Sequence, residues 1–208
     1  MESREADAAD VTGKRTLRRE LLAWRRALPA DRIATASATI VATLRGLPEL
    51  VRSSEDACDV LLHAADPDEP SLDALIADPP AGWRVLLPRV EDGAIVAVPA
   101  PPGARLRAGH RGIREPVGEP LRPAALAAVA AVVVPGVAFT ADGDRLGRGA
   151  GMYDRLLPRL HSAVRIGVCL EDVVRDSLPV EPHDARVDVV VTDASVRRSP
   201  THGRRPPA

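Results

Sequence analysis

A stretch of alternating glycines carries the strongest chemical signal in the sequence. It reads RLGRGAGMYDR from Arg145 to Arg155 and follows the apolar run Val132–Val134. Glycines at 147, 149 and 151 allow the backbone to approach a ligand closely. Arg145 and Arg148 add guanidinium groups, which match phosphate oxygens in pairs. A helix expected to begin near Gly151 would contribute unpaired N–H groups at its start. The pattern predicts a phosphate-binding loop, with a flexible surface loop carrying solvated arginines as the alternative.

Neither of the two common nucleotide-binding fingerprints fits this loop. A Rossmann fingerprint needs glycine where the chain has Met152, and no GK[ST] follows for a Walker loop. Asp154, in the first turn of the expected helix, has two interpretations. It either opposes the helix dipole, for about 0.3–1 kcal/mol, or holds Mg²⁺ beside bound phosphates, since one or two carboxylates plus phosphate oxygens usually hold this ion. The surrounding loop favours the metal ligand.

Length, charge and cysteine content limit the classes of protein. A chain of 208 residues can bury a sizeable core without disulfides or a structural metal. A net charge of −1 and a pI near 6.5 argue against nucleic-acid and membrane partners, which require a basic surface. Cys58 and Cys169 have neither zinc nor CxxC spacing, so reduced core thiols are expected. The N-terminus has no secretory pattern, and no apolar run reaches about 18 residues. We therefore expect a soluble cytoplasmic protein, and a monomer.

The apolar pattern predicts the elements that must position the loop. Helices are expected at Lys14–Leu28, at a segment capped by Asp31 and stopped by Gly46, and near residues 71–77, 123–129 and 151–160. Runs of strand length occupy residues 58–62, 83–87, 95–98, 130–134, 164–169 and 187–191. This alternation predicts a three-layer α/β fold with a mixed, mostly parallel sheet and helices on both faces. We expect one domain over residues 13–196, disordered tails at 1–12 and 197–208, and chemistry in the loops after the strands.

Several segments follow one another in the order and spacing of a known family. The block VVVPGVAFTADGDRLGRGAGMYDRLL contains the glycine loop, and the helical KRTLRRELLAWRRAL contains Lys14 and Arg18. DEPSLDALI points to Glu69, VLLPRV and GIREP lie in the middle of the chain, and LPVEPHDARVDVVVT points to Asp184. Together, over residues 14–192, these segments resemble the 5-formyltetrahydrofolate cyclo-ligase family (methenyltetrahydrofolate synthetase).

Three positions depart from the family's usual pattern. Ala150 stands where many members have Gly or Lys, Met152 where they usually have a first Tyr, and Ser71-Leu72 where the acidic stretch usually has Asp-Thr. Ala150 is easily tolerated. Met152 removes an aromatic ring, although a thioether can still pack against a ligand ring. The substrate end of the site is therefore less well determined by the resemblance than the nucleotide end.

The resemblance implies ATP as co-substrate, Mg²⁺ as the metal and a folate as the substrate. The catalytic residues that it implies are Lys14, Arg18, Arg145, Arg148 and Tyr153. Those implied to bind the nucleotide are Lys14, Arg15, Thr16, Leu17, Arg18, Arg145, Leu146, Gly147, Arg148, Gly149, Ala150, Gly151, Met152 and Tyr153. Those implied to bind the folate are Glu69, Arg148, Gly149, Ala150, Gly151 and Met152, and the implied metal ligands are Asp154 and Asp184.

The implied reaction is closure of 5-formyltetrahydrofolate to 5,10-methenyltetrahydrofolate by a C–N bond-forming ligase, through an iminium phosphate, with release of ADP and phosphate. Phosphoryl transfer needs mostly positioning and charge neutralisation. Glu69 either pairs with pterin N–H donors or is an exposed loop acid. Lys14, the only lysine, either contacts phosphates or lies on an exposed helix face where it adds little stability, and His183 is expected to be structural. The alternatives are a non-catalytic nucleotide- and folate-binding paralogue and another phosphate-handling enzyme, of the sugar-phosphate isomerase type.

Overall fold

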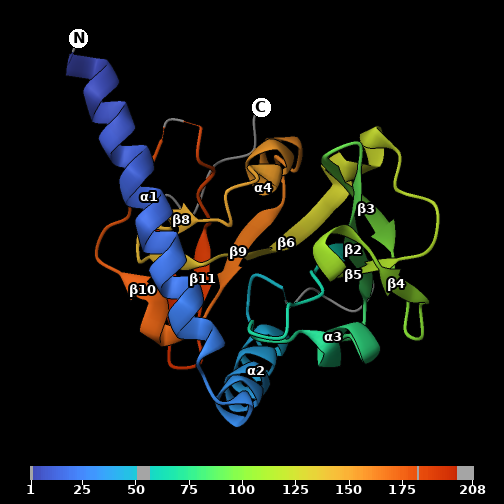
Figure 1. Ribbon diagram of the computed structural model, residues 1–208. Helices are drawn as coiled ribbons and strands as arrows, with labels where there is room; N and C mark the ends of the chain where they lie inside the picture. Colours follow the sequence, from blue (N-terminus) through green and yellow to red (C-terminus); the bar gives the residue numbers. More distant parts are fainter. Residues whose placement is uncertain (1, 51–56, 182, 201–208) are drawn as a thin grey trace.

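The computed structural model describes residues 2–50, 57–181 and 183–200, and only the backbone of residues 2–12 (Figure 1). Helix α1 spans Glu2–Arg26. It therefore begins twelve residues before the predicted start at Lys14, and residues 2–12, expected to be a tail, continue the helix. At the other end, strand β12 (Val196–Arg198) includes two residues of the expected C-terminal tail, because they pair with strand β11. Residues 201–208 lie outside the described part of the chain.

Helix α2 spans Ala30–Arg45 and differs from the prediction in how it begins. Pro29, in an extended conformation, occupies the N-cap position, and no side chain caps the helix there. Asp31 lies inside the first turn, where its charge complements the helix dipole, and it accepts a hydrogen bond from the N–H of Arg32 at 2.9 Å. The predicted cap is therefore wrong, because the helix starts before Asp31. The predicted stop at Gly46 is confirmed.

A seven-stranded sheet forms the centre of the molecule, in the order β12-β11-β9-β6-β1-β2-β3. The central strands β11 (Val189–Val191), β9 (Val164–Val168), β6 (Val129–Pro135), β1 (Cys58–Leu61) and β2 (Trp83–Glu91) run parallel. The edge strands β12 and β3 (Ala94–Pro99) pair antiparallel with their neighbours. The predicted mixed, mostly parallel sheet is confirmed, and all six predicted strand segments belong to it.

Helices cover both faces of this sheet, and strand β6 shows why. Val132 and Val134 belong to the core that Leu21 of α1 and Leu156 of α4 (Met152–Leu156) complete. Ala131 and Val133 belong to the core on the opposite face, with α2 and α3 (Asp73–Ala77). Because alternate residues of a strand point to opposite faces, a strand buried on both sides reads as a continuous apolar run. Figure 1 shows α2 and α3 at the bottom of the view, and α1 along the left side with its lower end near α2.

Shorter strands and 3-10 turns make up the rest of the described fold. A three-stranded sheet contains β10 (Val174–Arg175), β7 (Ala138–Thr140) and β8 (Arg145–Leu146). A hairpin joins β4 (Leu106–Ala108) to β5 (Arg114–Pro116) through the 3-10 turn η1 (His110–Gly112). The remaining 3-10 turns are η2 (Pro123–Ala128), η3 (Leu157–Arg159) and η4 (Glu171–Val173).

Two predicted helical segments form 3-10 turns over all or part of their length. Residues 123–128 form a 3-10 turn, and residues 151–160 divide into the five-residue α4 and the turn η3. Pro158 lies in η3 and has no N–H to continue an α-helical ladder. Such a short helix has little dipole, so the argument for a phosphate site depends on the glycines and cations of the loop rather than on the helix end. No helix in the described part of the chain is long and apolar enough to cross a membrane.

Candidate active site

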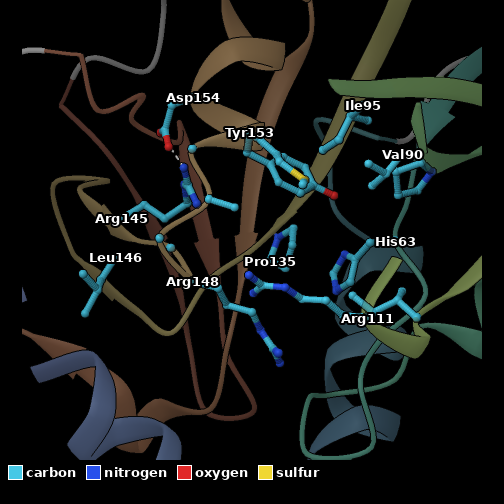
Figure 2. A pocket seen from close by; sticks show the side chains of 18 of the residues that line it. His63, Val90, Ile95, Arg111, Pro135, Arg145, Leu146, Arg148, Tyr153 and Asp154 are labelled. Atoms are coloured by element: carbon cyan, nitrogen blue, oxygen red, sulfur yellow. Dashed lines mark hydrogen bonds and ion pairs between the residues drawn. The ribbon is translucent and has the colours of Figure 1, made fainter. Parts of the chain in front are cut away.

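Most of the predicted site residues line one cavity of ≈ 270 Å³. It opens at the carboxyl ends of β1, β2 and β6, where parallel strands turn into loops, as predicted. In Figure 2, Arg145 and Asp154 lie on one side of it, Val90, Ile95 and Arg111 on the other, and Tyr153 between them. The first side carries an arginine and an aspartate, whereas the second combines the apolar Val90 and Ile95 with Arg111. The cavity therefore presents two different ends to a ligand.

The glycine loop forms the wall at the charged end. Gly149 and Gly151 have φ angles of +96° and +62°, a backbone conformation that other L residues rarely adopt. Arg18 of α1 donates a hydrogen bond from Nε to the carbonyl of Gly147 at 2.7 Å. A Cβ at Gly149 would lie 3.3 Å from the Arg18 guanidinium. The loop is therefore packed against α1 instead of being a free surface loop.

Lys14 lies at the same end, but in a different environment from the one expected. It is only 8 % exposed, and its Nζ lies 2.6 Å from Oδ2 of Asp184 and 3.0 Å from Oε1 of Glu181. Burial alone lowers the pKa of Lys14, but the hydrogen bonds to Asp184 and Glu181 outweigh it and raise the pKa. Burial raises the pKa of Asp184, but Lys14 outweighs it and lowers that pKa. The expectation of an exposed lysine that adds little stability is wrong, because the C-terminal segment packs over this turn of α1.

Arg145 and Asp154 form a second ion pair, with Nη2 of Arg145 2.5 Å from Oδ1 of Asp154. The β7–β8 hairpin places Arg145, and the turn of α4 places Asp154. Nε of Arg145 and the hydroxyl of Tyr153 are buried without a hydrogen-bond partner among the described residues. The guanidinium carbon of Arg145 lies 6.0 Å from the centre of the Tyr153 ring. Because buried polar atoms normally have partners, these two atoms indicate that a polar ligand completes the site.

Asp154 and Asp184 were expected to hold a metal ion, and their surroundings fit that role. The N–H of Ala185 donates to Oδ1 of Asp154 at 3.2 Å, which ties the two aspartates to one region. Among the described residues no group of three or more His, Cys, Asp and Glu side chains could hold a metal by itself. Mg²⁺ does not require one, since it binds one or two carboxylates together with phosphate oxygens and waters. Oδ2 of Asp154 and Oδ1 of Asp184 accept no hydrogen bond from the part of the chain that the structure describes.

Arg148 joins the glycine loop to the acidic stretch that follows β1. Its Nη2 lies 2.9 Å from Oε1 of Glu69, and its guanidinium also pairs with Asp66 and Asp68. Strands β1 and β6 are neighbours in the sheet, so the loops at their carboxyl ends meet. Arg148 therefore belongs to the Glu69 end of the cavity, whereas Lys14, Arg18 and Arg145 belong to the charged end.

Glu69 is only 8 % exposed, so the alternative of an exposed loop acid is wrong. Burial alone raises the pKa of this carboxyl, but the positive charges of protonated His63, Arg25 and Arg148 outweigh it and hold the pKa below its usual range. Burial lowers the pKa of His63, so at neutral pH the two arginines supply the charge. A carboxylate that stays ionised in a buried wall is a strong hydrogen-bond acceptor for a ligand.

Other residues complete the cavity without having been predicted. They are His63, Ala64, Pro88, Val90, Ile95, His110, Arg111, Ile113, Glu115, Pro135, Gly136, Glu181 and His183. Arg111 lies in η1 with φ +55°, and the buried Glu115 fixes that turn by accepting the N–H groups of Val90 and His110 at 3.2 and 3.0 Å. The VLLPRV and GIREP motifs were the sequence signals for this part of the wall. Arg25, which contacts Glu69, had no signal apart from its place in α1.

Three of the predicted nucleotide-binding residues do not line this cavity. Arg15, Thr16 and Leu17 lie between Lys14 and Arg18, which are four residues apart and share one helix face. Leu17 packs against the core instead. The other predicted positions all line the cavity: Lys14, Arg18, Glu69, Arg145, Leu146, Gly147, Arg148, Gly149, Ala150, Gly151, Met152, Tyr153, Asp154 and Asp184.

The sheet and the cationic glycine loop at its edge define an α/β protein with a cavity that is positively charged at one end, and comparisons with known proteins identify its family. The sequence profile of the 5-formyltetrahydrofolate cyclo-ligase family matches residues 10–193. The chain is 35% identical over 190 residues to the 5-formyltetrahydrofolate cyclo-ligase of Mycolicibacterium smegmatis, covering 86% of this chain and 93% of that protein. The chain belongs to the 5-formyltetrahydrofolate cyclo-ligase family, a family of ligases.

Solved structures agree with this assignment. The NMR structure of the 5,10-methenyltetrahydrofolate synthetase of Aquifex aeolicus superposes with a TM-score of 0.78 at 34% identity, over 94% of this chain and 96% of that one. The 5,10-methenyltetrahydrofolate synthetase of Mycoplasma pneumoniae superposes with a TM-score of 0.64 at 21% identity, over 86% of this chain and 98% of that one. At that lower identity the second comparison supports the fold alone.

Proposed function

We propose that this chain uses ATP and Mg²⁺ to close 5-formyltetrahydrofolate into 5,10-methenyltetrahydrofolate, with release of ADP and phosphate. The observation that carries the proposal is one cavity that joins a cationic glycine loop to a buried, ionised carboxylate. A phosphoryl group and a folate would meet there. Family membership supports the same reaction, and the comparison proteins are named for it.

The charged end is suited to the phosphates. Lys14, Arg18 and Arg145 provide three positive charges there, and Glu181, Asp184 and Asp154 balance them. Phosphate oxygens would take the cations as partners, while Mg²⁺ would take Asp154 and Asp184, so that every charge keeps a counter-charge. Mg²⁺, when bound, neutralises charge on the transferring phosphoryl group. The backbone of residues 147–151 would approach the phosphates closely because glycines alternate there.

The opposite end is suited to a folate. The Glu69 carboxylate can accept hydrogen bonds from the amino and ring N–H groups of a pterin, and it lies in the cavity wall beside Arg148. The apolar side chains of Val90, Ile95 and Met152 line the same cavity. Met152, where the family usually has Tyr, still packs against this region, so the departure leaves an apolar wall in place.

The chemistry requires an N-formyl oxygen to become a leaving group. In the proposed sequence, a bond forms between this oxygen and the terminal phosphorus of ATP, and the bond from that phosphorus to the ADP oxygen breaks. The neighbouring folate nitrogen then attacks the formyl carbon and loses its proton, and phosphate departs with the former formyl oxygen. The chain contributes mainly position and charge, which is what phosphoryl transfer requires. Arg145 and Lys14 would stabilise the charge that develops on the phosphoryl group.

The experiment that tests this function is the appearance of the methenyl chromophore from purified protein, with and without ATP. We expect absorbance to rise only when ATP, Mg²⁺ and 5-formyltetrahydrofolate are all present. Binding of both ligands without turnover would indicate a non-catalytic paralogue. No folate binding, together with ATP-independent turnover of a phosphorylated sugar, would indicate an enzyme of the isomerase type. Either of these outcomes would overturn the proposal.

A further inference from the structure

Arg25 is the most completely buried cation near the site, and the mechanism above does not use it. It lies in the last turn of α1 and is 4 % exposed. Its Nε donates to Asp68 and its Nη2 to Oε1 of Glu69, both at 3.2 Å, and its Nη1 reaches the carbonyl of Gly136 at 3.5 Å. Each nitrogen of the guanidinium therefore has a partner in the protein.

Arg25 also lies on the side of Glu69 that faces away from the large cavity. It is not among the residues that line the large cavity, while Glu69 and Arg148 are. Arg25 instead lines a separate cavity of ≈ 10 Å³ together with His63 and Glu69. That volume suits about one water molecule, so a folate cannot reach Arg25 through it. Any effect of Arg25 on the substrate must act through Glu69.

Arg25 and Arg148 hold the same oxygen, Oε1 of Glu69, with different degrees of freedom. The Arg148 side chain is 30% exposed and faces the cavity, and it divides its contacts among Asp66, Asp68 and Glu69. Arg25 is enclosed and joins α1 to the acidic stretch. Removing one partner of a buried ion pair is costly, because the remaining charge stays buried. Arg25 therefore keeps a counter-charge on Glu69 even when Arg148 leaves it.

We propose that Arg25 is a positioning residue for folate recognition, which fixes the Glu69 carboxylate from behind so that Arg148 can exchange partners when substrate enters. This inference rests on the proposed folate site at Glu69. It gives the two arginines different roles, since Arg25 is a permanent support and Arg148 is a movable contact in the cavity wall.

The test is a double-mutant cycle in the full chain, read as equilibrium binding of 5-formyltetrahydrofolate and of ATP. We expect Arg25→Gln to weaken folate binding roughly 10- to 100-fold, as loss of a charge-assisted hydrogen bond does, and to change ATP binding less than about twofold. In a Glu69→Gln background, Arg25→Gln should weaken folate binding no further, because its effect passes through that carboxylate. The exposed neighbour supplies the control, and Arg26→Gln should leave both affinities unchanged.

Arg25→Lys extends the cycle in case the glutamine variant does not fold. It keeps the charge but cannot span Asp68, Glu69 and Gly136 together, so it should show a smaller loss with the same dependence on Glu69. An equal loss with and without the Glu69 carboxylate, or an equal loss of folate and ATP binding, would overturn the positioning role. If the unaltered protein binds no folate, the proposed function itself fails, and the positioning role fails with it.

Discussion

At the scale of single residues, every cation at the charged end is held by a protein oxygen. Lys14 pairs with Glu181 and Asp184, Arg145 pairs with Asp154, and Arg18 donates to the Gly147 carbonyl. Such a site keeps its side chains in place before a ligand arrives. Phosphates and Mg²⁺ would exchange these contacts for equivalent ones, so that binding leaves no charge unpaired. This arrangement makes separate predictions for the individual partners.

Lys14→Ala should reduce both activity and stability. Loss of a charge-assisted hydrogen bond to phosphate costs about 1.5–3 kcal/mol, or roughly 10- to 150-fold in ATP-dependent kcat/KM. The variant also leaves Glu181 and Asp184 without their cation, so we expect the free energy of unfolding to fall by about 1–2 kcal/mol. Steady-state kinetics and urea unfolding measure the two effects. Arg19→Ala, an exposed change on α1, is the control, and unchanged kinetics in the Lys14 variant would remove this residue from the site.

Glu69→Gln should separate the two ligands. The amide keeps the shape of the side chain but cannot accept as a carboxylate, and we expect folate to bind roughly 10- to 100-fold more weakly. The ATP dissociation constant should change little, because the phosphates lie at the opposite end. Calorimetric titration with each ligand measures this difference. The exposed Glu119→Gln serves as the control, and equal losses for both ligands would indicate misfolding instead of lost recognition.

Asp154→Asn tests the metal site. The change keeps the shape of the side chain but weakens a metal ligand, so we expect turnover to fall by on the order of 10² or more. The defect should become smaller at high Mg²⁺, because mass action opposes weakened binding. Tight ATP binding should also require a higher Mg²⁺ concentration, which titrations at two Mg²⁺ concentrations would detect. Asp142→Asn, in the exposed turn between β7 and β8, is the control, and full activity of the Asp154 variant at low Mg²⁺ would contradict the assignment.

At the scale of elements, the loops after neighbouring strands bring distant residues together. The loop after β1 carries His63 and Glu69, and the loop after β6 leads to Arg145 and Arg148. Because β1 and β6 are adjacent and parallel, these loops meet at one edge of the sheet. In the sheet, β9 and β11 lie beyond β6, and β2 lies beyond β1 in the opposite direction. The order in which strands are added therefore reverses between β1 and β6. A ligand cavity is expected at such a point.

The edge strand β12 depends on an ion pair that titrates in acid. Arg197 of β12 pairs with Glu171 of η4, and hydrogen bonds from Arg197, Thr192 and Ser195 outweigh the opposing effect of burial. They lower the pKa of Glu171 from about 4.5 to about 2. A carboxyl whose pKa is lower in the folded state stabilises the fold above its unfolded pKa, and this contribution disappears as pH falls through the folded pKa. The relevant window therefore lies between about pH 4.5 and pH 2.

Glu171→Gln should consequently make the protein less stable at pH 7 and make its stability less dependent on pH below about 4.5. Urea unfolding of both proteins at several pH values across this window measures the change. Asp176→Asn, an exposed change nearby in the same segment, should keep the slope of the unaltered protein. Parallel pH profiles for the Glu171 variant and the unaltered protein would show that the pair does not stabilise β12.

At the scale of the whole molecule, the layers of helices and sheet could be predicted from the sequence more completely than the contacts between side chains. The continuous run around Val132–Val134 and the periodicity of α1 and α2 were sufficient for the three-layer α/β architecture, because they report burial directly. Helix starts were less predictable: Pro29 replaced Asp31 as the cap, and residues 2–12 extended α1. Helix boundaries depend on which of several nearby residues caps the helix, and the apolar pattern does not contain that information.

The site was predictable where its residues are close in the chain or belong to a family motif. Gly147, Gly149 and Gly151 predicted a close approach of the backbone to a ligand by their residue type alone. Arg25 could not be identified in this way, since the sequence of α1 contains several arginines and does not distinguish a solvated one from one buried against Glu69. His63 and Arg111 were missed for the same reason, because their roles depend on the adjacency of loops that only the strand order determines.

The central claim is that phosphoryl transfer to the formyl oxygen and ring closure occur in one cavity, and the fate of that oxygen tests it directly. The protein would be given 5-formyltetrahydrofolate labelled with ¹⁸O in the formyl group, unlabelled ATP and Mg²⁺, and the released phosphate would be analysed by mass spectrometry. We predict one ¹⁸O atom in each phosphate released, in step with formation of the methenyl product. Methenyl product that accumulates while the phosphate remains unlabelled, or that forms without ATP, would contradict this account.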